Sequence, residues 1–399
     1  MARTDTLGNF LTDIATAIRN KKGTTDTIVA SNFDTEIESI ESGGSGGDTS
    51  VEDGLITRTL TEYSNNRVTE VGKYAFYYST TLQSIDLPNV TSIDNYAFQN
   101  CTSLQSINLP KVTNINEYAF YLCTSLQSVS LPNLISIGVA GFRSCTKLKT
   151  IDIPCATTLG TYSFEGCSLL EFINIPNLNK TSNYAFQNCK SLQSVSLLNL
   201  TAVGSRDFQN CTSLQSIDLP NVTSINEYAF YGCTSLELVN LPIISSISRY
   251  AFQNCTSLQS IDLSKIITIN SGDNIFHGCS SLKYINLQSC KSIKGYNIFY
   301  NCTSLEYIDF PSLTAINSGT NDMFKNTTSL TAIILRSETM CTLNSAYTFR
   351  DSLIASGTGY IYVPSALIDS YKTATNWSTY ANQFRAIEDY PEICGETTA

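Results

Sequence analysis

The chain has 399 residues, of which 15% are charged, and its formal net charge is −10. This acidic balance argues against nucleic acid and anionic lipid headgroups as partners, because both are bound through clusters of Lys and Arg. No apolar run approaches the length of about 18 residues that spans a bilayer, so we expect no membrane insertion.

Residues 1–42 differ in pattern from the rest and predict a helical anchoring module. Apolar residues from Leu7 to Ile18 follow helical spacing, and Phe33, Ile37 and Ile40 suggest a second short helix. So small a unit cannot build a strong core by itself. We therefore expect it to dock on a partner chain or to self-associate, which would make the protein a homo-oligomer.

The segment that follows predicts a tether and a first coil. Residues 43–50 are rich in Gly and Ser and predict a flexible linker, and residues 51–75 predict an atypical coil that caps the N-terminal end of a repeat array. Asp5 and Asp13 fall where a secretory signal would be apolar, so we expect no such signal in the chain as written. A signal removed upstream stays an open alternative.

A single frame recurs from residue 76 to residue 335. After each Phe come Cys three residues on, Leu at six, Ile or Val at nine, Leu or Ile at eleven and often Pro at twelve. A repeat of this length with this core predicts a leucine-rich solenoid, whose coils bury their apolar edges against one another. The spacing is 22 residues up to Phe252 and 23 to 25 after it, at Phe76, Phe98, Phe120, Phe142, Phe164, Phe186, Phe208, Phe230, Phe252, Phe276, Phe299, Phe324 and Phe349.

Each coil predicts mostly β structure. Leu104, Ile107 and Leu109 alternate as the inward side of a strand, a second apolar pair follows, and a Tyr-Ala-Phe corner closes the coil. The predicted fold class is an α/β-type repeat solenoid with mostly β coils. Residues 336–399 predict a last atypical coil and a C-terminal cap, with a strand at 360–363, a helix to about Thr373 and a closing segment from Trp377.

Ten of the 14 cysteines occupy one position of the repeat. Ser79 and Thr327 replace Cys in that frame, so the position requires a small side chain rather than a disulfide partner. Free Cys is among the most buried residue types, which predicts a column of reduced, inward-facing thiols. A column stepping from coil to coil does not converge as metal ligands must, so we expect no metal site there.

The unit from Tyr96 to Ile115, Tyr-Ala-Phe-Gln-Asn-Cys-Thr-Ser-Leu-Gln-Ser-Ile-Asn-Leu-Pro-Lys-Val-Thr-Asn-Ile, resembles the BspA-type leucine-rich repeat. The resemblance implies a surface adhesin. The tail from Ile361 to Trp377 resembles the cap of such arrays in gut bacteria and their phages. The head from Leu11 to Asp26 is similar to a segment that begins phage and prophage tail or virion proteins of Firmicutes, which implies that residues 1–42 bind other virion proteins.

Few residues suggest chemistry. His277 is the sole His and stands at a variable position of the repeat, which favours an exposed residue over a general base. Asp262 and Asp309 share their position with Asp86, Asp152 and Asp218 and alternate with Asn, which predicts an exposed polar ladder. A paired-carboxylate hydrolase and a Ca²⁺ site both stay open in principle. We expect no enzyme activity and no cofactor.

One exposed strand position is Ser in most coils but Phe172, Leu238, Tyr284 and Tyr307 in four of them. Exposed apolar side chains of this kind are candidate contacts for a ligand, and Asp262 and Asp309 would lie beside them. The alternative is that each covers a neighbouring residue. The regular tyrosine stripe before each Phe, by contrast, predicts structural packing.

These patterns predict a non-catalytic recognition protein. The leading hypothesis is a phage or prophage virion appendage of the tail-fibre type, made in the host cytoplasm, that binds a host cell-surface glycan or protein. The alternative is an adhesin at the bacterial cell surface. A purely structural virion decoration protein is a further alternative.

Overall fold

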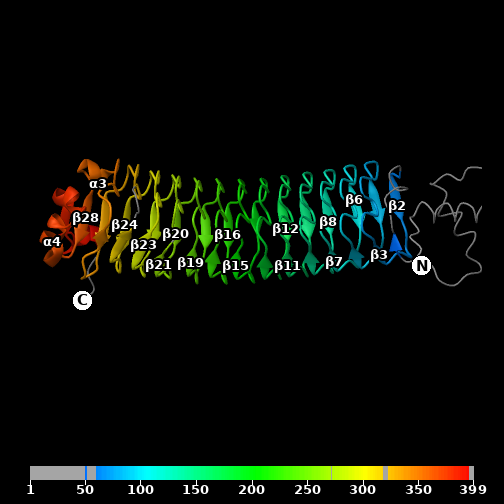
Figure 1. Cartoon of the computed structure of the whole chain (residues 1–399), viewed down its shortest axis with the longest axis horizontal. Helices are drawn as coiled ribbons and strands as arrows, with labels where there is room; N and C mark the ends of the chain where they lie inside the picture. Colours follow the sequence, from blue (N-terminus) through cyan, green and yellow to red (C-terminus); the bar gives the residue numbers. More distant parts are fainter. Residues whose placement is uncertain (1–49, 52–59, 271, 318–321, 395–399) are drawn as a thin grey trace, which may run out of the picture.

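The computed structural model describes residues 50–51, 60–270, 272–317 and 322–394, so the module predicted at residues 1–42 lies outside them. The described chain is a rod of stacked coils. It runs from β2 (Glu62–Ser64) at one end to the helices α3 (Leu353–Ser356) and α4 (Ile368–Thr373) at the other (Figure 1). The predicted fold class, a leucine-rich solenoid with mostly β coils and a C-terminal strand–helix cap, is confirmed.

Each coil contributes one strand to a first parallel ladder. Ile85 pairs with Ile107 in the next coil, and the same register continues along the rod, interrupted into several sheets. The strands of the first ladder are β2, β4 (Ser84–Asp86), β6 (Ser106–Asn108), β8 (Ser128–Ser130), β10 (Thr150–Asp152), β12 (Phe172–Asn174), β14 (Ser194–Val195), β16 (Ser216–Asp218), β18 (Leu238–Asn240), β20 (Ser260–Asp262), β22 (Tyr284–Asn286), β24 (Tyr307–Phe310), β26 (Ala332–Leu335), β28 (Tyr360–Val363) and β29 (Phe384–Ala386).

A second parallel ladder follows from the second apolar pair of each coil. Most of its strands have two residues, of which the second is turned inward, as in the pair of Ile93 with Ile115. They are β1 (Ser50–Val51), β3 (Glu70–Val71), β5 (Ser92–Ile93), β7 (Asn114–Ile115), β9 (Ser136–Ile137), β11 (Thr158–Leu159), β13 (Lys180–Thr181), β15 (Ala202–Val203), β17 (Ser224–Ile225), β19 (Ser246–Ile247), β21 (Thr268–Ile269), β23 (Ser292–Lys294), β25 (Ala315–Asn317) and β27 (Thr342–Leu343).

The recurring Phe residues form the core of the rod. All of them from Phe76 to Phe349 are fully buried, and neighbouring rings stack with centroids 4.9 to 5.8 Å apart. Stacked aromatic rings contribute beyond the area they bury. The strict sequence period therefore reflects one continuous column, in which each coil supplies a ring that the next coil covers.

The corner around each Phe is built on left-handed backbone. Residues two before and two after the Phe have positive φ, as at Tyr96 (61°) and Asn100 (61°) around Phe98. Such φ values are unfavourable for side chains other than Gly and Asn. Hydrogen bonds between coils support them, since the amides of Tyr96, Phe98 and Asn100 donate to carbonyls of the next coil at 2.7 to 2.9 Å.

The ten in-frame cysteines are buried and free, as predicted. Each thiol lies within hydrogen-bonding distance of a Phe carbonyl of the preceding coil, as from Cys101 Sγ to Phe76 O at 3.0 Å. Thr327 at the same position donates its hydroxyl to Phe324 O at 2.7 Å. The column therefore selects small side chains that can donate a hydrogen bond. Burial raises the pKa of the Cys101 thiol to about 12, so this thiol stays protonated.

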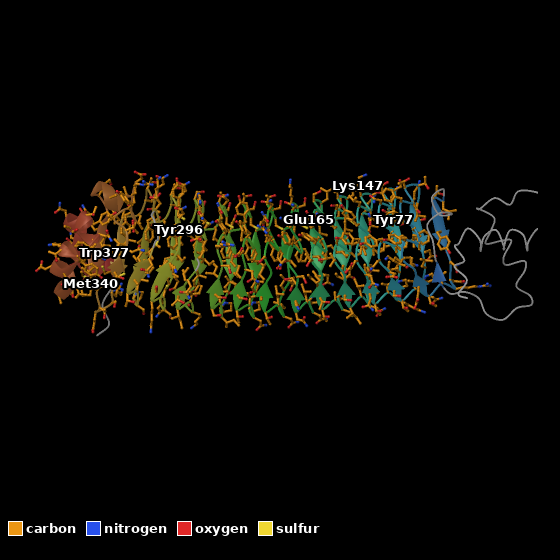
Figure 2. The ribbon with its side chains drawn as sticks, in the orientation of Figure 1. Tyr77, Lys147, Glu165, Tyr296, Met340 and Trp377 are labelled. Atoms are coloured by element: carbon orange, nitrogen blue, oxygen red, sulfur yellow. The ribbon has the colours of Figure 1, made fainter. Side chains whose placement is uncertain are left out.

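The C-terminal cap ends the Phe column. Trp377 lies in the cap at the end of the rod (Figure 2). Trp377 and Tyr380 pack against Phe349, and Trp377 Nε1 donates to Cys341 O at 2.7 Å. The strand predicted at 360–363 is β28, and the predicted helix is divided into a 3-10 turn and α4. The cap also contains η3 (Ser365–Leu367), η4 (Trp377–Gln383), η5 (Ile387–Asp389) and α5 (Pro391–Cys394).

Candidate functional site

The outward side of the first ladder, which we call the strand face, is lined mainly by Ser and by Asp or Asn. The first residue of each first-ladder strand from β4 to β24 points outward on this face. It is Ser in several strands, such as Ser84 in β4 and Ser260 in β20, and a larger residue in others. Four apolar side chains predicted as ligand contacts all lie on this face. Their exposed fractions are 51% for Phe172, 60% for Leu238, 40% for Tyr284 and 40% for Tyr307.

Tyr284 and Tyr307 contact each other on the strand face. They lie at the starts of β22 and β24, and their ring centroids are 5.8 Å apart with the planes tilted by 47°. Phe172 and Leu238 are each flanked in the ladder by Ser, at Ser194 and Ser216 respectively. The structure therefore brings together two of the four predicted residues and leaves the other two on separate coils.

The polar ladder on the strand face is made of Asp–Asn pairs. Asn108 Nδ2 donates to Asp86 Oδ1 at 2.7 Å, and the same contact recurs twice farther along the rod, also at 2.7 Å. Asp262 is exposed and its Oδ1 accepts from Ser264 N at 2.9 Å. These pairs satisfy each carboxylate locally, and no cluster of three metal-binding side chains occurs in the part of the chain that the structure describes.

Asp309, predicted as a ligand contact, is half-buried and engaged with the cap. Arg336 Nε lies 3.0 and 2.9 Å from its two carboxylate oxygens, and the same guanidinium donates to the carbonyl of Cys394. Asp309 therefore joins the last coils to the C-terminal segment. Its position in the repeat could not show this, because Arg336 and Cys394 lie outside the repeat frame.

The tyrosine stripe is a stacked ladder, which agrees with the predicted packing role. Tyr74 and Tyr96 stack at 5.1 Å, and Tyr228 and Tyr250 at 4.4 Å. Arg206 stands at the same repeat position and inserts between two tyrosines, with Cζ 4.5 Å from the Tyr228 ring. Such cation–π contacts hold the column together where a Tyr is missing.

His277 is half-buried rather than fully exposed, packs edge-on against Tyr300 and lies 2.9 Å from Asn274 Oδ1 through Nδ1. Burial lowers the pKa of this imidazole below its usual value. Its described neighbours are an amide and a tyrosine ring.

Sequence reasoning missed a fully buried carboxylate at Asp207. It stands where half of the other corners have Ala. Its oxygens accept from the amides of Ala185 at 3.1 Å and Gly204 at 2.7 Å and from the Thr181 hydroxyl. Gly204 is needed there, because a Cβ would lie 2.8 Å from Asp207 Oδ2. Burial nevertheless raises the pKa of Asp207 to about 6. The replacement of Tyr-Ala-Phe by Arg206-Asp207-Phe208 was the available signal.

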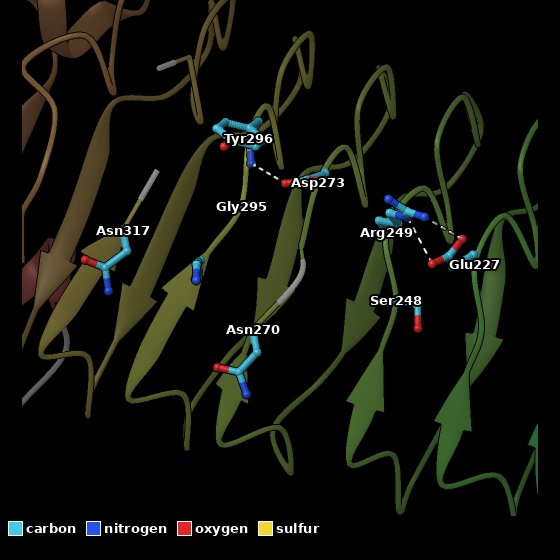
Figure 3. A pocket seen from close by; sticks show the side chains of 9 residues that line it. Glu227, Ser248, Arg249, Asn270, Asp273, Gly295, Tyr296 and Asn317 are labelled. Atoms are coloured by element: carbon cyan, nitrogen blue, oxygen red, sulfur yellow. Dashed lines mark hydrogen bonds and ion pairs between the residues drawn. The ribbon is translucent and has the colours of Figure 1, made fainter. Parts of the chain in front are cut away.

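A pocket of about 430 Å³ opens on a different side, where strands of the second ladder end (Figure 3). Arg249 pairs with Glu227 at one end of it at 2.9 Å, and Asp273 Oδ1 accepts from the amide of Tyr296 at 2.9 Å. The sequence did not single out this site. Its lining is Glu227, Ser248, Arg249, Asn270, Asp273, Lys294, Gly295, Tyr296 and Asn317.

The profile of the family described as BspA type Leucine rich repeat region (6 copies) matches residues 69–193, 136–248 and 223–355. Together these matches extend over residues 69–355, well over half of the chain. The chain belongs to the BspA-type leucine-rich repeat family. No curated protein matches it. The resemblance drawn from the Tyr96–Ile115 unit is therefore confirmed.

Solved structures resemble this BspA-type chain over most of its length. A leucine-rich repeat protein from Bacteroides ovatus is 26% identical and has a TM-score of 0.58, and the match covers 80% of this chain and 87% of that one. A leucine rich cell surface protein from Faecalibacterium prausnitzii is 24% identical with a TM-score of 0.36, over 67% of this chain and 85% of that one. Neither is described as a phage or virion protein.

The BspA-type family and its solenoid are typical of binding rather than of catalysis, and leucine-rich repeat proteins generally mediate contacts with other proteins. The described residues contain no helix long and apolar enough to cross a bilayer. The virion role gains no support from these comparisons, and the cell-surface alternative agrees better with the family. The segments that suggested other virion partners lie at residues 1–42, outside the described residues.

Proposed function

We propose that this BspA-type chain is a non-catalytic adhesin of the bacterial cell surface that binds a partner protein through the strand face. The observation that carries the proposal is the exposed pair Tyr284–Tyr307, whose rings contact each other on a face lined mainly by Ser, Asp and Asn. Tyrosines contribute large contact areas while few rotatable bonds are immobilised on binding. Contact energy should therefore concentrate on β22 and β24.

The solenoid supports this role because it is preorganised. Coils linked by two parallel ladders and one Phe column hold the exposed residues in fixed positions, so little conformational entropy is lost on binding. Leu238 and Phe172 extend the apolar surface toward the N-terminal end as separate contacts. Asp262 lies opposite Asn286 in the ladder, two residues along from the level of Tyr284, and supplies a carboxylate near the tyrosine pair.

The test replaces Tyr284 and Tyr307 by Ser, the residue of most other coils, and measures binding of the labelled chain to epithelial cell monolayers. We expect a loss of about tenfold or more in apparent affinity with an unchanged melting temperature, because hot-spot residues carry most of the binding energy. Protease treatment of the cells should abolish binding if the partner is a protein.

A matched control is Tyr74→Ser, which replaces an equally exposed tyrosine at the far end of the rod on the corner side. This control should bind as the unmodified chain does. If the Tyr284→Ser/Tyr307→Ser variant binds cells at full strength while keeping its melting temperature, the binding surface lies elsewhere and the proposal is wrong.

A further inference from the structure

The pocket at the ends of the second-ladder strands is formed by two columns of the repeat. One column follows the inward residue of each strand, as at Ser248, Asn270 and Lys294. The other stands three residues before the corner Phe, and contributes Glu227, Arg249, Asp273 and Tyr296 to the lining. Pocket residues on successive coils are therefore equivalent positions, displayed side by side by the stacking.

Longer turns separate these two columns and open the pocket. Phe252 comes five residues after Ile247, whereas Phe276 comes seven after Ile269. In the shorter coil the residues that belong to the two columns, Ser248 and Arg249, are consecutive in the sequence. In the longer coil the corresponding residues are Asn270 and Asp273. The pocket extends from Glu227 and Arg249 in the shorter coils to Asp273 and Tyr296 in the longer ones, so it lies at the boundary where the repeat lengthens.

The wall of the pocket requires glycine. A Cβ at Gly295 would lie 2.6 Å from the carbonyl carbon of Gly272 and 2.9 Å from Asp273 N. The close approach of these two backbones places Asp273 where its Oδ1 accepts from the Tyr296 amide at 2.9 Å. Asn95 and Asn183 make the same contact in other coils, so one oxygen of Asp273 has a structural role, while the residue also lines the pocket.

The lining has the chemistry of a site for a neutral polyhydroxylated ligand. Its two acids, Glu227 and Asp273, are balanced by two bases, Arg249 and Lys294, so the site carries no net charge. A hydroxyl group can both donate and accept a hydrogen bond. Carboxylate side chains accept hydrogen bonds from hydroxyls, and amide side chains both accept from them and donate to them. The negative face of an aromatic ring attracts weakly positive C–H groups, and Tyr296 is 44% exposed at the rim.

We propose that this pocket binds one neutral hexopyranose unit of a surface glycan, with the sugar ring against Tyr296 and its hydroxyls on Asp273 and Asn317. The volume lies within the range of about 300 to 1,000 Å³ of small-molecule sites. The site is separate from the strand face, because its residues belong to the second ladder and its corners. Its function does not depend on the tyrosine pair of β22 and β24.

The experiment titrates the full chain with methyl β-D-glucopyranoside, methyl β-D-galactopyranoside and methyl α-D-mannopyranoside, followed by saturation-transfer NMR up to about 10 mM, where a millimolar Kd is measurable. We expect saturable binding of at least one glycoside. Tyr296→Ala should weaken it by about tenfold or more, and Tyr296→Phe should restore it, because the ring and not the hydroxyl carries the stacking.

Two controls separate this site from general effects. Tyr347→Ala removes a tyrosine that is 58% exposed in the last coil, and Tyr284→Ser/Tyr307→Ser removes the strand-face pair; both should leave the sugar affinity unchanged. The proposal is wrong if none of the three glycosides shows saturable binding, or if the Tyr296→Ala variant binds them as tightly as the unmodified chain does. It is also wrong if D-glucuronate binds more tightly than every neutral sugar.

Discussion

Asp207 makes the stability of this solenoid depend on pH in a predictable direction. Its pKa rises from 3.8 to about 6 in the folded chain, because full burial penalises the carboxylate more than its three donors stabilise it. The folded state therefore holds the proton more tightly than the unfolded state. This contribution to stability is present in full below the unfolded pKa and is lost as the pH rises through the folded pKa.

A pKa shift of this size changes the free energy of unfolding by about 3 kcal/mol over the whole titration of Asp207. About 2 to 3 kcal/mol of this change occurs between about pH 4 and pH 7. Asp207→Ala removes the titrating group and introduces the residue that half of the other corners have. We expect the difference in unfolding free energy between the unmodified chain and this variant to change as the pH rises from about 4 to about 7. The unmodified chain should lose about 2 to 3 kcal/mol of stability relative to the variant. Denaturant titrations of both proteins at several pH values measure the difference.

Other carboxylates titrate in the same interval, but they are common to both proteins and cancel in the comparison. Asp218→Ala is the matched control, since Asp218 is exposed on the strand face and is hydrogen-bonded to Asn240. Its pH profile should run nearly parallel to that of the unmodified chain. Parallel profiles for Asp207→Ala as well would refute the inference that burial raises the pKa of Asp207.

Two further predictions test the interior of the rod. A thiol reagent should modify only Cys155, the single exposed cysteine, in the native chain and all 14 cysteines after denaturation; a lower total would reveal disulfides. Phe186→Ala should destabilise the chain by about 3 to 5 kcal/mol, because it removes a ring stacked at 5.7 and 5.2 Å between its neighbours. Phe172→Ser, on the exposed strand face, should change stability by less than about 0.5 kcal/mol in thermal or denaturant unfolding.

Much of this protein was determined by its sequence alone. The 22-residue period, the inward Leu and Ile positions, the buried cysteine column and the four exposed apolar residues on the strand face all follow from a repeated unit that each coil folds in the same way. In a solenoid each coil contacts mainly its neighbours, so a position in the repeat specifies an environment. The position of a residue in the repeat therefore predicts whether its side chain is buried or exposed.

Only the tertiary structure decided what happens where the repeat is broken. Asp207 is buried because its corner position faces the core, Asp309 is engaged because the cap brings Arg336 to it, and the pocket beside Tyr296 opens because lengthened turns separate two columns. Each depends on contacts between coils or with the cap. The sequence records the substitutions and insertions, but the distances between coils determine whether they make an ion pair, a buried charge or a pocket.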